Sequence, residues 1–236
     1  MEENIKTVFH WTDLALDDYQ KLINAEYPQG NSPNFVIARA GLIATESLAK
    51  FAHPYKNGAI PNRFDKIEAK PAIQYFYQQF FTNPRYAQIA YFLWDAYRNP
   101  LAHIGTLRKI VNVPIEEIKN SFLAGVHISG STIEQLEVDQ PQRKLEEKEH
   151  LGFYLNTNNR GIVRPIFRFS PVIYYFDLKE AVTNFKNKLS TDNTLRTRFS
   201  KAYPLFEESV RLDFQNADRI PPSETNLLIE EITDLL

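Results

Sequence analysis

The sequence predicts a mostly α-helical fold, and two observations carry that prediction. Along the first hundred residues apolar side chains recur every three or four positions, the period of a helix with one buried face. Only residues 151–176 carry β-type runs around an Asn- and Gly-bearing turn, which predicts a small β-hairpin insertion in the C-terminal half. The chain of 236 residues is 43% hydrophobic and 13% aromatic, enough to build one sizeable core.

The first half, residues 1–128, is predicted to be a helical core. Ser32 precedes Pro33 at the position where helices tolerate proline, and Pro84 follows Asn83 in the same way. The pattern over residues 84–97 is apolar on most sides, so this helix is expected at the centre of a bundle. The predicted helices cover residues 12–27, 33–52, 69–81 and 84–97, with further helical character near 114–123.

The second half is predicted to be more mixed. Residues 129–150 are polar and charged, which predicts a linker or mobile loop. Within the hairpin region, Val172 to Phe176 is expected to add a short strand, while Pro165 and Pro171 disfavour a long, centrally paired one. Helices are expected again over 177–220, followed by an acidic, Leu-rich tail over 221–236.

The composition excludes several classes of function. Lys and Arg number 27 against 29 Asp and Glu, a net charge of −2, so any contact with nucleic acid must be local. There is no cysteine, no signal-peptide pattern and no long apolar run, and we expect a cytoplasmic protein without a membrane partner. The histidines show no metal-ligand spacing and no phosphate-binding glycine pattern occurs, so neither a metal nor a cofactor is predicted.

The pattern richest in chemistry is Arg-Asn-Pro-Leu-Ala-His at residues 98–103. A guanidinium can hold a phosphate, and an imidazole transfers protons near neutral pH. On one unbroken helix Arg98 and His103 would point about 140° apart. Pro100 cannot continue a helix without losing a hydrogen bond, and Asn99 is a favoured cap, so a break is expected that turns Arg98 and His103 toward one side.

This run resembles the signature of the HEPN superfamily, in which an arginine and a histidine stand four to six residues apart and a polar residue often follows the arginine. The resemblance covers about residues 33–125. It implies an antiparallel helical bundle that dimerises through the motif face and, in catalytic members, cleaves RNA without a metal. Carried over, Arg98 would hold the scissile phosphate, His103 would transfer a proton, and Asn99 would orient one of them.

The expected function is therefore a metal-independent endoribonuclease in a toxin or defence setting, with a composite site at a homodimer interface. RNA or a nucleotide and an antitoxin protein are the expected partners. Two alternatives stay open: a non-catalytic HEPN module that binds a nucleotide, RNA or a protein, and a capped helix bend in which Arg98 pairs with a carboxylate such as Asp95.

Three further residues are weaker candidates for substrate binding. Arg108 and Lys109 follow the motif and could widen a phosphate-binding patch, or be solvated charges at the end of a helix. Glu46 on the second predicted helix could supply a site carboxylate, although a surface charge is the commoner role for such a residue.

Overall fold

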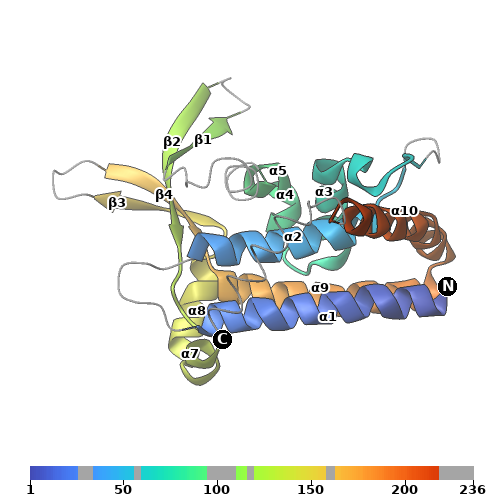
Figure 1. Ribbon diagram of the computed structural model, residues 1–236. Helices are drawn as coiled ribbons and strands as arrows, with labels where there is room; N and C mark the ends of the chain where they lie inside the picture. The colour runs from blue at the N-terminus through green and yellow to red at the C-terminus, as the bar shows by residue number, and fades with distance from the viewer. Residues whose placement is uncertain (26–33, 56–59, 95–109, 116–119, 158–162, 218–236) are drawn as a thin grey trace, which may run out of the picture.

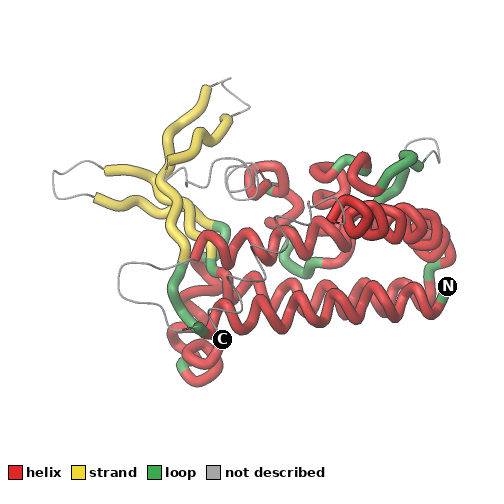
Figure 2. Tube along the Cα trace, viewed as in Figure 1, coloured by secondary structure: helices red, strands yellow, loops and turns green. Residues whose placement is uncertain are grey.

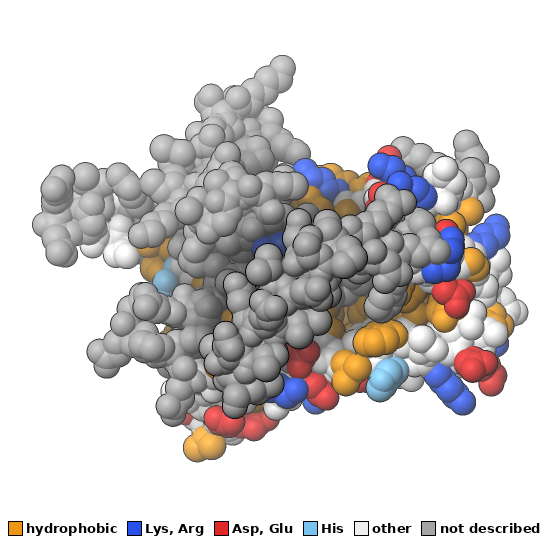
Figure 3. Space-filling model, in the orientation of Figure 1, with side chains coloured by type: hydrophobic (Ala, Val, Ile, Leu, Met, Phe, Trp, Pro, Cys, Tyr) orange, Lys and Arg blue, Asp and Glu red, His pale blue; other side chains and the backbone are white. Residues whose placement is uncertain are grey.

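The computed structural model describes residues 1–25, 34–55, 60–94, 110–115, 120–157 and 163–217. These residues are mostly helical, as predicted, and a small sheet lies at one end of the long helices (Figure 1). Figure 2 shows the same division, with helices filling the body and the strands projecting from that end. On the face seen in Figure 3, acidic, basic and apolar side chains of the described residues are interspersed.

Three long helices form the core layer: α1 (Glu2–Asn24), α2 (Asn34–Ala52) and α9 (Pro171–Thr191). Helix α1 runs antiparallel to α9: the Tyr19 hydroxyl donates to the carbonyl of Pro171, and Phe9 packs against Phe185 near the other ends. It begins at Glu2 rather than at residue 12. Acidic residues in the first turn favour a helix start, and Val8 and Phe9 extend its buried face.

The remaining helices of the body close the core around aromatic side chains. They are α3 (Ala69–Phe80) and α10 (Asn193–Ala217), with a 3-10 turn, η2 (Phe64–Lys66), before α3. The predicted second and third helices are thus confirmed within one or two residues. Phe51 of α2 stacks on Phe199 of α10 with ring centroids 4.9 Å apart, so that helices distant in the sequence share one core.

The single helix predicted over residues 84–97 is wrong. The described part of this segment forms two short helices, α4 (Arg85–Gln88) and α5 (Ala90–Leu93), separated at Ile89, whose φ of −114° and ψ of 18° are not helical. Tyr86 and Leu93 are fully buried whereas Tyr91 is exposed, so the segment packs as two turns against α3 rather than as a central helix.

The predicted helical character near residues 114–123 is also wrong, since this region forms strands β1 (Ile110–Ile115) and β2 (Asn120–Ile128). They pair antiparallel, with Ile110 opposite Gly125 and Ile115 opposite Asn120. β-branched residues in β1 favour a strand, and Pro114 is tolerated because β1 lies at the edge of the sheet. The helical domain predicted over residues 1–128 therefore ends in strands.

Residues 129–150, predicted as a linker or mobile loop, instead form α7 (Ile133–Val138) and α8 (Gln140–Glu149). Thr132 and Gln135 make a reciprocal capping box, and Asp139 caps α8 by accepting from the backbone of Gln142. The caps satisfy backbone groups at the helix starts, and burial of Leu136 fixes α7 to the body. A charged composition therefore did not mean disorder here.

The predicted hairpin is confirmed as β3 (Gly152–Thr157) and β4 (Val163–Phe169), which pair antiparallel. Strand β4 also pairs parallel with β2, which gives a four-stranded sheet in the order β1-β2-β4-β3. Pro165 is tolerated in this inner strand because the pairing with β2 begins only at Ile166. The hairpin is thus half of a larger sheet rather than an isolated insertion.

The short strand predicted over Val172–Phe176 is wrong, because these residues form the first turns of α9. Ser170 caps the helix by accepting from the backbone N–H of Ile173, and Pro171 occupies the first helical turn. These start signals outweigh the strand propensity of the residues after them.

No helix in the described ranges combines the length and the hydropathy needed to cross a membrane.

Candidate functional site

The sequence-predicted motif lies outside the described residues. Arg98, Asn99 and His103, together with Arg108 and Lys109, fall in the range 95–109. The flanks of that range are described: the fully buried Leu93 of α5 precedes it and Ile110 of β1 follows it. In the sequence the motif thus lies between α5 and β1.

Glu46 is the one sequence-predicted site residue that the structure describes. It lies on α2 with 8% of its surface exposed, and its carboxylate pairs with Lys50 one turn later at 3.0 Å. The expectation of a solvated surface charge is therefore wrong. Both side chains are about one-tenth exposed, and the Lys50 ammonium also lies 5.4 Å from the centre of the Phe64 ring.

A buried chain of hydrogen bonds links His150, Tyr86 and Asp177. The backbone N–H of Ser170 donates to His150 Nδ1 at 2.9 Å, so the proton of a neutral imidazole must sit on Nε2. His150 Nε2 lies 2.7 Å from the hydroxyl of Tyr86, which itself donates to Asp177 Oδ2 at 2.6 Å. The order of donation is therefore His150 to Tyr86 to Asp177.

Local backbone geometry positions His150. Helix α8 ends at Glu149, and Leu151 takes a φ of 58°, in the left-handed region where glycine is usual. Leu151 is fully buried, its N–H donates to the carbonyl of Arg168 at 2.9 Å, and its own carbonyl accepts from Arg85 Nε. This tight turn directs the imidazole inward between α4 and α9.

Burial sets the protonation states along the chain. Burial lowers the pKa of His150 to about 3, against the smaller opposing influence of Glu146. Burial, together with Glu180 and Glu147, raises the pKa of Asp177 to about 6, although the Tyr86 hydrogen bond and Arg143 act the other way. At neutral pH the imidazole is neutral and Asp177 is mostly ionised.

A second buried cluster joins α8 to β4. Glu146 is fully buried and accepts hydrogen bonds from Ser129, from Ser131 at 2.7 Å and from Arg168 Nη2 at 3.1 Å. Arg168 also binds Glu149. Burial alone would raise the pKa of Glu146, but the serine hydrogen bonds and the Arg168 charge hold it below its ordinary value. The cluster is a buried ion pair whose carboxylate also accepts from serine hydroxyls.

A third set of hydroxyls ties α2, α3 and α9 together. Thr45 donates to the carbonyl of Gly41 at 3.0 Å, so the Tyr174 hydroxyl, 2.6 Å away, must donate to Thr45. Tyr77 then donates to Tyr174 across 2.9 Å. Burial raises the pKa of Tyr174 and Tyr77 well above the ordinary value of a phenol. Each of these three hydroxyl protons is donated in a hydrogen bond, which suits a structural role.

Sequence reasoning missed these clusters. Its one available signal was local: Ser129, Ser131 and Ser170 lie next to strand ends, where short polar side chains often bond to backbone. The partners come from positions far apart in the sequence, so their meeting depends on the tertiary fold. In the described part of the chain no group of three or more His, Asp or Glu side chains could hold a metal ion.

Comparison of the chain with protein-family models, with curated proteins and with solved structures gave no match.

Proposed function

We propose that this chain is a HEPN-like, metal-independent endoribonuclease whose composite site forms between two copies of the chain. The observation that carries the proposal is the order Arg98-Asn99-Pro100-Leu101-Ala102-His103, which sets a guanidinium and an imidazole close together in the sequence, a few positions after α5. A mostly helical fold and the anchoring of α4 and α5 by the fully buried Tyr86 and Leu93 support it.

The chemistry requires few groups. The 2′-hydroxyl of RNA is an internal nucleophile, so cleavage needs a base, a proton donor and a cation for the charge that develops on phosphorus-bound oxygens. In the proposal His103 transfers the proton and Arg98 stabilises the phosphate. A two-fold axis beside the motif doubles this set to two histidines and two arginines around one groove, which is why the proposal includes a homodimer.

The test is cleavage of single-stranded RNA by the purified full chain in excess EDTA. His103→Ala and Arg98→Ala should each lower the rate by about 100-fold or more. Replacing the ribose 2′-hydroxyl with hydrogen at every position of the substrate should abolish cleavage. His10→Ala and Arg63→Ala are matched controls, because both residues are exposed, are described by the structure and lie far from residue 98 in the sequence.

Equal cleavage by the wild type and both motif variants would overturn the proposal. RNA or nucleotide binding without cleavage, lost in the same variants, would favour a non-catalytic HEPN module instead. The observation that favours this second function is the four-stranded sheet, because a helical bundle alone would not contain one. Sedimentation should give twice the mass of the 27.4-kDa chain.

A further inference from the structure

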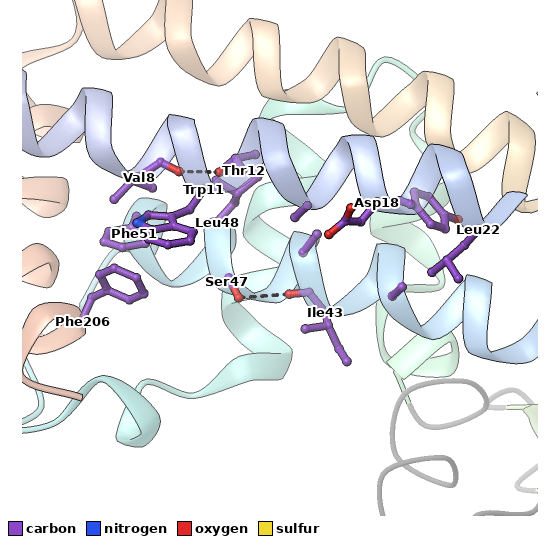
Figure 4. Close-up of a pocket in the computed structure, with 14 residues that line it drawn as sticks. Val8, Trp11, Thr12, Asp18, Leu22, Ile43, Ser47, Leu48, Phe51 and Phe206 are labelled. Carbon is purple, nitrogen blue, oxygen red and sulfur yellow. Dashed lines mark hydrogen bonds between the residues drawn. The ribbon is translucent and has the colours of Figure 1, made fainter. Parts of the chain in front are cut away.

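An apolar groove runs between α1 and α2 and is separate from the polar clusters described above. Its volume is about 440 Å³. Figure 4 shows Val8, Trp11, Phe51 and Phe206 gathered toward one end, with Leu22 toward the other. The groove exists because alanines, rather than larger residues, face it from both helices: Ala15 from α1, and Ala40 and Ala44 from α2.

The walls of the groove are mostly apolar, and the one charged side chain among the described residues that line it, Asp18, pairs with Lys21 at 3.1 Å. Trp11 is 59% exposed and Ile43 is 39% exposed, so large apolar side chains line an open face. The hydroxyls in the wall are already used within their own helix: Thr12 donates to the carbonyl of Val8 at 2.8 Å, and Ser47 donates to that of Ile43 at 3.1 Å. A helix with one apolar face fits such a surface, because its backbone polar groups are satisfied internally.

The chain carries a segment of this chemistry beyond α10. Within residues 227–236, Leu228, Ile232 and Leu235 recur at helical spacing, while Glu230 and Asp234 fall on the opposite side. A ten-residue helix is about 15 Å long, and the groove wall from Val8 to Leu22 spans about 21 Å of α1. Such a short helix is only marginally stable alone in water, so its apolar face needs a surface to cover.

The connection is long enough for the segment to reach the groove. Phe206 of α10 is part of the groove wall, and α10 ends at Ala217, about 16 Å further along its axis. Residues 218–226 then supply nine residues, which extend to at most about 30 Å. Pro221 and Pro222 favour a turn or extended backbone rather than a continued helix, which allows the chain to reverse direction.

We propose that residues 227–236 dock as an amphipathic helix in the groove between α1 and α2 of the same chain. Leu228, Ile232 and Leu235 cover the side chains of Trp11 and Ile43, and the acidic side chains face solvent. The inference is argued from the groove and the C-terminal sequence and does not rest on the proposed ribonuclease function.

A disulfide-trapping experiment tests the docking in the full chain, which has no natural cysteine to interfere. Ile43→Cys combined with Ile232→Cys should form an intramolecular disulfide on mild oxidation, seen as a cross-linked peptide in a monomer-mass band. Ile43→Cys combined with Glu230→Cys is the matched control, because residue 230 lies on the opposite face of the segment. Equal trapping of both pairs, a disulfide only between chains, or no disulfide would each overturn the proposal.

Tryptophan quenching provides a second measurement without cysteines. In a Trp94→Phe background Trp11 is the only tryptophan. Leu228→Asp with Ile232→Asp should raise the acrylamide quenching constant about twofold, because the indole loses its cover. Glu230→Gln with Asp234→Asn should leave it unchanged. A quenching constant that is the same in all three proteins contradicts the docking.

Discussion

Asp177 accepts the hydroxyl proton of Tyr86 at 2.6 Å, although the two residues are 91 positions apart in the chain. The same hydroxyl oxygen lies 2.7 Å from His150 Nε2. One tyrosine thus connects a carboxyl group whose pKa is raised with an imidazole whose pKa is lowered, and these two shifts act on stability in opposite directions as the pH changes.

The first prediction concerns His150. Its folded pKa of about 3 lies below the ordinary 6.5, so its contribution to stability is present above pH 6.5 and declines as the pH falls. Between pH 6.5 and 4.5 the decline from this residue is about 2 kcal/mol. Urea unfolding of His150→Gln should therefore lose less free energy over this range than the wild type. His10→Gln removes an imidazole from an exposed position and is the control for this variant.

The second prediction concerns Asp177, whose folded pKa of about 6 exceeds the ordinary 3.8. The folded state holds this proton more tightly, so the contribution is present at low pH and is lost as the pH rises through 6. The free energy of unfolding of Asp177→Asn minus that of the wild type should rise by about 2 kcal/mol from pH 4.5 to pH 7.5, measured by urea unfolding. A pH-independent difference between the two proteins would show that Asp177 is not desolvated.

The third prediction concerns the ion pair of Arg168 with Glu146. Arg168→Met should lower the free energy of unfolding by about 3–5 kcal/mol, because it leaves a fully buried carboxylate without its cation. Adding Glu146→Gln should restore part of that loss. Arg143→Met is the matched control: its pair with Glu147 is one-third to one-half exposed, and its removal should cost less than about 1 kcal/mol. Equal losses from both arginine variants would contradict the assignment.

The fourth prediction concerns Gly41 on α2. A Cβ added there would lie 2.8 Å from Tyr19 Cζ and 2.9 Å from Tyr174 Cε1, both in fully packed rings. Gly41→Ala should therefore destabilise the protein by about 1–3 kcal/mol in thermal or urea unfolding. Helix propensity alone would give the opposite sign, a gain of about 1 kcal/mol. Ser47→Ala, exposed on the same helix, should change stability by no more than about 0.5 kcal/mol.

Prediction from sequence succeeded where one helix or hairpin carried its own signal. Helices α2 and α3 and the pairing of β3 with β4 follow from local apolar spacing and turn residues. Prediction failed where helix-capping residues indicated a helix but the charged composition of the segment indicated a loop. Thr132 with Gln135, and Asp139 with Gln142, start helices in a segment whose charge alone suggested a loop. The capping residues were visible in the sequence and were outweighed there by the charge pattern.

The candidate site divides in the same way. The Arg98 to His103 motif comes from the sequence and stays a prediction, because it lies outside the described residues. The His150, Tyr86 and Asp177 chain had no sequence signal, because its members come from α4, the end of α8 and α9. Glu46 shows the difference at a single residue, since helical position identified it but only packing showed that it is buried against Lys50.

The sequence by itself determined that this chain is mostly helical, where several of its helices lie, and where the six-residue pattern Arg-Asn-Pro-Leu-Ala-His stands, on which the proposed function rests. Those properties depend on neighbours within a few positions, through helical period and backbone capping. Only the tertiary structure decided that β2 pairs with β4, that Glu146 meets Arg168, and that an apolar groove forms between α1 and α2. Those contacts join residues far apart in the chain, and they depend on which elements pack together, which no local pattern specifies.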